Sequence, residues 1–179
     1  IAAQKFEIKI DGLETELVLK DDSKYSKDDA YLMNVALEQT VEEIIGNFEN
    51  TSVVVYDSNG KELSATEKIR TGCEVALVVD GTKVDSVTVV LKGDITGDGC
   101  IDGTDYLRIK SFFMGGLALE VANGLAADMD LDGNISSTDY LIIKSIFTAS
   151  KSNFVRTNMS MYKSDIEIAK EAKLQPVFD

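Results

Sequence analysis

The chain contains no histidine and no tryptophan, and only one proline and two cysteines among its 179 residues. The absence of histidine removes the commonest general base and excludes His-dependent catalytic triads and histidine-ligated zinc sites. Two cysteines cannot supply a four-ligand zinc site. Glycine-rich phosphate loops are also missing. We therefore expect a protein without catalytic residues of its own.

The charge balance is strongly acidic, with 31 acidic and 18 basic residues and a net charge of −13. This balance argues against nucleic acid as a partner. No apolar run is long enough to span a membrane, so membrane insertion is not expected. The sequence opens with Ile1-Ala2-Ala3-Gln4 and shows no leader pattern, which predicts a mature or excised fragment rather than a precursor.

Two twelve-residue stretches, 94–105 and 128–139, repeat one pattern. Each carries side-chain oxygens at positions 1, 3, 5 and 12, glycine at 6 and isoleucine at 8. This is the spacing of an EF-hand calcium loop, in which alternate side chains converge on one point. The pattern predicts two Ca²⁺ ions, one in each loop, and folding of the loops coupled to metal binding.

The ligand set follows from the loop positions, since position 7 supplies a backbone carbonyl and position 9 binds directly or through water. The predicted ligands in the first loop are Asp94, Thr96, Asp98, Cys100, Asp102 and Asp105. The predicted ligands in the second loop are Asp128, Asp130, Asp132, Asn134, Ser136 and Asp139.

The segments around the loops differ from an ordinary EF-hand. The first loop follows a strand-like, β-branched run at 87–93 instead of a helix, and only 123–127 precedes the second loop. Helices are expected after the loops, at Thr104–Met114 and Ser137–Thr148, with closely similar sequences. We therefore predict two loop–helix units that pack antiparallel with approximate two-fold symmetry.

Residues 93–149 thereby resemble a dockerin, the calcium-dependent module that attaches cellulosome-type enzymes and scaffolds to cohesin domains. The resemblance is carried by two Asp-x-x-x-Asp-Gly-x-Ile-x-x-Thr-Asp loops and by Lys110 and Lys144, each five residues after a closing aspartate. Two positions depart from the family pattern. Thr96 stands where Asn or Asp is usual, which predicts a weaker first site, and Gly103 replaces the usual serine.

The resemblance implies a non-catalytic adaptor that binds a cohesin. Such an adaptor would anchor its parent protein in a secreted, carbohydrate-degrading assembly at a bacterial cell surface. The two helices also carry more apolar residues than their own pairing needs, which favours an exposed binding surface. The predicted partner-binding residues are Gly103, Thr104, Leu107, Lys110, Ser111, Ser137, Thr138, Leu141, Lys144 and Ser145.

Residues 1–92 are predicted to form a separate β-rich module with one short helix at Thr40–Phe48, so the whole chain is expected to be α+β. The expected strands are Lys5–Ile10, Glu14–Lys20, Ser52–Tyr56, Lys61–Ser64, Glu74–Val79 and Ser86–Leu91. The module is predicted to be grasp-like or, alternatively, immunoglobulin-like. It resembles small non-catalytic domains that precede dockerins in clostridial and ruminococcal secreted proteins, through Thr40–Ile45, Tyr56–Lys61 and Thr71–Val75.

A second function remains open, in which the chain is a calcium-stabilised adhesive or carbohydrate-binding fragment that acts through residues 1–92. Tyr25, Tyr31 and Tyr56 would then replace tryptophan as sugar platforms. Residues 150–179 are expected to form a C-terminal tail with a possible charged helix at Met161–Leu174, and no function is predicted for it.

The sequence leaves open whether the two cysteines form a disulfide. Cys73 and Cys100 are both expected in exposed turns, where a disulfide would join the two modules. Alternatively, they are two free thiols too far apart to bond.

Overall fold

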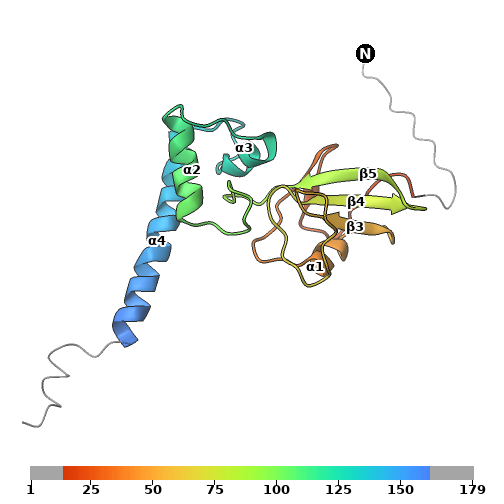
Figure 1. Cartoon of the computed structure of the whole chain (residues 1–179), viewed down its shortest axis with the longest axis horizontal. Coiled ribbons are helices and arrows are strands. Elements are labelled where there is room, and N and C mark those ends of the chain that lie inside the picture. Colours follow the sequence, from red (N-terminus) through yellow and green to blue (C-terminus); the bar gives the residue numbers. More distant parts are fainter. Residues whose placement is uncertain (1–13, 162–179) are drawn as a thin grey trace, which may run out of the picture.

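The chain folds as a sheet module followed by a helical module, and a computed structural model describes residues 14–161. Figure 1 shows the sheet and α1 on one side of the molecule and α2, α3 and α4 on the other. The elements are β1 Ser26–Lys27, β2 Tyr31–Met33, α1 Val41–Ile45, β3 Val53–Tyr56, β4 Glu74–Val79, β5 Thr82–Val89, α2 Gly103–Phe113, α3 Val121–Ala127 and α4 Ser137–Met161.

The sheet has five strands in the order β1-β2-β5-β4-β3. Neighbouring strands are antiparallel except β2 and β5, which run parallel. Helix α1 covers the core with Ile44 and starts at a capping box, in which Thr40 and Glu43 bond each other's backbone N–H groups. The buried core side chains include Leu32, Ile44, Val55, Ile69, Val75, Leu77, Val87 and Val89.

The predicted helix and three of the predicted strands are confirmed as α1, β3, β4 and β5. Strand β5 begins earlier than expected because Asp80 and Gly81, both at positive φ, form a two-residue turn that joins it directly to β4. A single mixed sheet packed by one helix agrees in outline with the grasp-like expectation. The immunoglobulin-like alternative needs a second sheet, and residues 14–161 contain only the one.

Other strand predictions fail for local reasons. Glu14–Lys20 forms one isolated bridge instead of a strand, because side chains take the place of a partner strand: the Leu17 N–H donates to Asp85 Oδ2 at 2.7 Å. Lys61–Ser64 likewise contributes only a single bridge to β3. The predicted strand Lys5–Ile10 lies outside the described residues.

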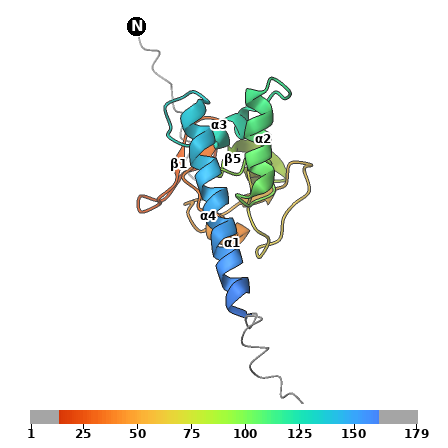
Figure 2. The same cartoon turned by 90° about the vertical axis from the view of Figure 1, so that its left-hand side faces the viewer.

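The helical module contains a pair of helices, α2 and α4, with α3 between the two loops. The sequence did not predict α3, which leads directly into the second loop. Helix α4 continues past its expected end at Thr148 to Met161. Figures 1 and 2 both show it extending beyond α2. The charged helix predicted at Met161–Leu174 falls almost wholly outside the described residues. Within the described part of the chain, no helix combines the length and apolarity needed to cross a membrane.

Candidate calcium loops and docking surface

Each loop ends by starting a helix. Asp102 is the N-cap of α2, and the carboxylate of Asp105 accepts the Asp102 N–H in a capping box. The second loop repeats this arrangement, because Asp139 Oδ2 accepts the Ser136 N–H at 2.7 Å and Ser136 Oγ accepts the Thr138 N–H. Loop positions 9 and 12 therefore both close the loop and set the first turn of the helix.

The closing aspartates also reach back across their loops. Asp105 Oδ1 accepts the Thr96 N–H at 2.9 Å, and Asp139 Oδ1 accepts the Met129 N–H at 2.7 Å. Both side chains are fully buried. Each loop is thus drawn into a ring by its own twelfth residue, as the spacing predicts.

The pKa values of the two closing carboxyls are shifted in opposite directions. Burial raises the pKa of Asp105, against the opposing effect of the N–H groups that it accepts. Burial acts in the same direction on Asp139, but the backbone N–H groups of Ser136, Met129 and Asp130 outweigh it and lower its pKa. A bound cation would hold both groups as carboxylates.

The donor set fits a calcium ion. One carboxylate oxygen from each of Asp128, Asp130 and Asp139 lies within 4.8 Å of the others, and within the described residues this is the one group of three acids that converges so closely. Close-set, partly buried carboxylates are unfavourable without a cation, and calcium prefers oxygen ligands of this kind. In the first loop Thr96 occupies the place of Asp130, and its hydroxyl bonds Asp105.

The helices are held together by a small core between the loops. Ile95, Ile109, Ala127 and Ile143 are fully buried there. Tyr106 and Tyr140 occupy equivalent positions in the two repeats, and their hydroxyls lie 2.9 Å apart. These equivalent contacts agree with the approximate two-fold relation that the sequence predicts.

The predicted partner-binding residues lie along α2, along α4 and at the starts of these helices. Leu107 is 61% exposed and its counterpart Leu141 is 58% exposed, a high value for large apolar side chains. Gly103 and Ser111 are half-buried and the other predicted contact residues are exposed. All ten residues are therefore at least partly accessible to a partner.

The two ends of the helix pair are not equivalent. At one end the Phe147 ring stacks on Tyr106, with ring centroids 5.4 Å apart. A Cβ added to Gly103 would come within 3.1 Å of Phe147, so the missing side chain allows this close packing. At the other end Phe113 meets Tyr140 edge-on.

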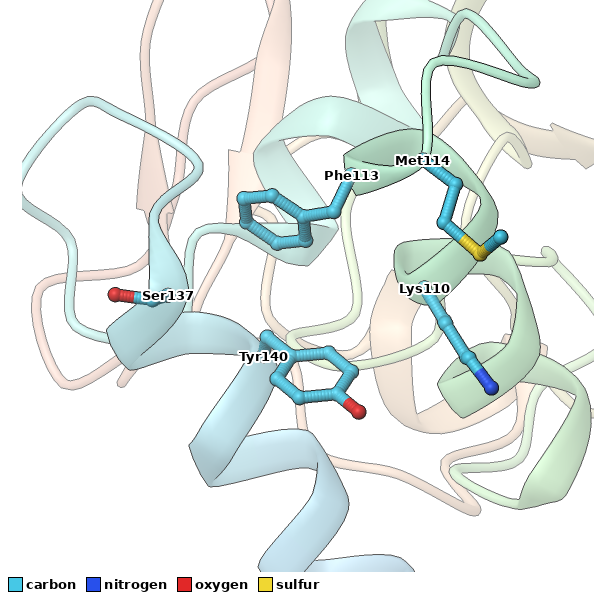
Figure 3. Close-up of a pocket in the computed structure, with 5 residues that line it drawn as sticks. All are labelled: Lys110, Phe113, Met114, Ser137 and Tyr140. Carbon is cyan, nitrogen blue, oxygen red and sulfur yellow. The ribbon is translucent and has the colours of Figure 1, made fainter.

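The end near Phe113 is hollowed. An open hollow of about 250 Å³ lies between the end of α2 and the start of α4. Figure 3 shows the side chains that line it. Its lining residues are Lys110, Phe113, Met114, Ser137 and Tyr140. The hollow is therefore lined by both repeats and carries the ammonium-bearing side chain of Lys110.

The disulfide between Cys73 and Cys100 is not formed, and both cysteines are free. The expectation that Cys73 lies in an exposed turn is wrong, because its side chain belongs to the core of the sheet module. Burial raises the pKa of its thiol. Cys100 is exposed at position 7 of the first loop, as expected.

The tyrosines proposed as sugar platforms are partly engaged within the sheet module. The Tyr25 hydroxyl donates to Gln39 Oε1 at 2.5 Å, and the Lys83 ammonium lies 4.7 Å from the centroid of the Tyr56 ring. These contacts give two of the three tyrosines a structural role.

Sequence reasoning did not find the contacts between the first loop and the sheet module. The Thr71 N–H of the sheet module donates to Asp94 Oδ2 of the first loop at 2.9 Å. Nothing in the spacing of the loop signals a donor 23 residues earlier in the chain.

The paired units define a helix-pair module in which each helix follows a loop with calcium-type spacing. Residues 92–148 match the family model of the Dockerin type I domain. Dockerin type I domains are calcium-dependent, non-catalytic modules that bind cohesins. The match covers well under half of the chain, and most of the sheet module lies outside it. Comparisons with curated proteins and with solved structures find no match.

Proposed function

We propose that this protein is a non-catalytic adaptor whose dockerin module binds a cohesin and anchors the parent protein in a secreted, carbohydrate-degrading assembly. The organisation that we propose is an accessory module at 1–92, a dockerin at 93–149 and a tail at 150–179. The observation that carries the proposal is the pair of exposed leucines, Leu107 and Leu141, on helices that match the dockerin family model.

The proposed partner surface combines apolar and cationic groups. Leu107 and Leu141 would be desolvated against the cohesin, while Lys110 and Lys144 would pair with its carboxylates. This assignment is supported by the exposure of all four side chains, because none of them is needed for the core between the helices. The proposed surface comprises the ten residues predicted from the sequence.

The proposed calcium ligands are those predicted from the loop positions. Calorimetric titration of the metal-free protein with Ca²⁺ should give two sites. Asp139→Ala should remove one site, because it takes away a buried carboxylate of the convergent triad. Glu42→Ala, which changes an exposed acid of α1, serves as the control and should leave both sites. A stoichiometry below two for the unaltered chain would contradict the assignment.

Cohesin binding tests the proposed function directly. A panel of immobilised cohesins should retain the full chain in calcium and release it in excess chelator. The Leu107→Ala/Leu141→Ala variant should lose most of the binding, roughly tenfold or more in Kd, because hot-spot residues dominate such interfaces. Val84→Ala, at an exposed apolar residue of the sheet module, is the matched control.

The alternative function, carbohydrate binding through the sheet module, is tested by running the same variants against a glycan panel. Binding to a glycan panel that persists in Val84→Ala and in the double leucine variant, without any cohesin retained in calcium, would favour the carbohydrate-binding alternative and overturn the adaptor proposal.

A further inference from the structure

The first loop is docked on a turn of the sheet module at residues 69–72. Thr71 is almost fully buried, and its N–H donates to Asp94 Oδ2 at 2.9 Å. The Thr71 hydroxyl accepts the Leu91 N–H at 3.0 Å and donates to the Leu91 carbonyl at 3.3 Å. The turn is therefore fixed to the end of the sheet just before the loop, with one backbone donor aimed at the carboxylate of loop position 1.

Loop position 4 shows how tightly the turn and the loop fit. Gly97 in the first loop and Leu131 in the second loop both have positive φ, at 74° and 62°. A leucine is therefore accepted at this position by the loop itself, and Leu131 is 62% exposed. In the first loop, a Cβ on Gly97 would lie 2.9 Å from the Thr71 carbonyl oxygen. The glycine is required by the neighbouring turn and not by the loop.

Loop position 6 shows the same difference. A Cβ on Gly99 would lie 3.5 Å from the Ile69 carbonyl oxygen, whereas a Cβ on Gly133 in the second loop would meet nothing within 4 Å. In both loops the carboxylate at position 1 accepts the N–H groups of positions 5 and 6, from Asp98 and Gly99 to Asp94 and from Asp132 and Gly133 to Asp128. Asp94 accepts the Thr71 N–H in addition, so the first loop also rests on the sheet module.

We propose that the turn at residues 69–72 is a structural part of the first calcium site, with Thr71 as the positioning residue for Asp94. The proposal rests on calcium binding by the loops. It implies that Ca²⁺ in the first loop and the packing of this turn strengthen each other, because coupling between two equilibria is reciprocal. The support from the turn would offset the weaker calcium binding expected from Thr96, which stands at the loop position where the second loop has the carboxylate of Asp130. The second site would bind independently of the sheet module.

The test exchanges the residues at loop position 4. In the full chain, Gly97→Leu places in the first loop the residue that the second loop accepts, and Leu131→Gly is the matched control. Calcium titration of Gly97→Leu should show one of the two sites weakened about tenfold or more, the effect of losing one hydrogen bond to a charged group. Leu131→Gly should keep the first site unchanged.

Hydrogen exchange gives a second readout. In the unaltered chain, Ca²⁺ should slow exchange of the Thr71 amide, and this effect should disappear in Gly97→Leu. A second pair of variants guards against misfolding: Thr71→Ala removes the hydroxyl that holds Leu91, whereas Thr71→Ser keeps it. Thr71→Ala should weaken one calcium site, and Thr71→Ser should leave both sites as they are.

The outcomes separate the two proposals. If the unaltered chain binds no Ca²⁺, the proposed calcium loops fail. If it binds two ions and both Gly97→Leu and Thr71→Ala bind them with unaltered affinities, the loops stand and the composite site is overturned. Equal weakening of both sites in Gly97→Leu would also overturn it, because the second loop has no contact with the substituted position in this proposal.

Discussion

Removing calcium should unfold the helix pair of residues 93–149 and leave the core of the sheet module folded. The core between the helices is small, and Asp94, Asp105 and Asp139 are fully buried beside it. Without a cation, burial of the charged form of Asp105 opposes folding. Each ion would add about 2.7 kcal/mol of stability at a free concentration 100 times its Kd, a large share of the stability of a small module.

Circular dichroism should therefore lose most of its helical signal when a chelator is added. Hydrogen exchange should remain slow in β4 and β5, whose side chains pack in a separate core. The Asp105→Asn/Asp139→Asn variant should behave in calcium as the unaltered chain does in chelator. A helical signal that is unchanged by chelation would show that the helix pair folds without metal.

Cohesin binding should depend more strongly on Lys110 than on Lys144. The approximate symmetry of the helices would allow a partner to dock in two orientations related by 180°. The hollow beside Lys110, together with the close packing of Phe147 on Gly103 at the opposite end, makes the two orientations unequal. A partner side chain that fills the hollow would favour one of them.

We expect Lys110→Ala to raise the Kd for cohesin by roughly tenfold and Lys144→Ala to raise it much less. The double variant should bind more weakly than either single variant, because the second orientation is then also impaired. The comparison requires calorimetry with one cohesin at constant calcium and salt. If each single substitution abolished binding, two-way docking would be excluded. If both had equal moderate effects, the expected preference would be wrong.

The candidate site was more predictable from the sequence than the sheet module was. Calcium loops are local, since their ligands lie within twelve residues and their spacing alone identifies them. Helix α1 was equally predictable, because Thr40 and Glu43 form a capping box within one turn. In contrast, β1 and β2 are two and three residues long and carry no alternating pattern that would reveal them.

The other features that the sequence analysis missed or predicted wrongly depend on contacts between residues far apart in the chain. Cys73 follows a glycine in a turn, and only the folding of β4 and β5 places its side chain in the core. Thr71 gives no sequence signal as a neighbour of the first loop, because it acts through its backbone N–H. The asymmetry of the helix pair was visible as Gly103 opposite Ser137, but its consequence required the position of Phe147.

The capping boxes at the ends of the two loops affect the order of folding. Starting a helix is its slow and unfavourable step, because one turn must be fixed before any hydrogen bond is gained. Asp105 and Asp139 fix that first turn with the same carboxylates that would hold the ion. Metal capture and helix initiation would then be one kinetic event. Calcium would speed the formation of α2 and α4 as well as slow their unfolding, so the chain would acquire its helices at the moment it meets the ion.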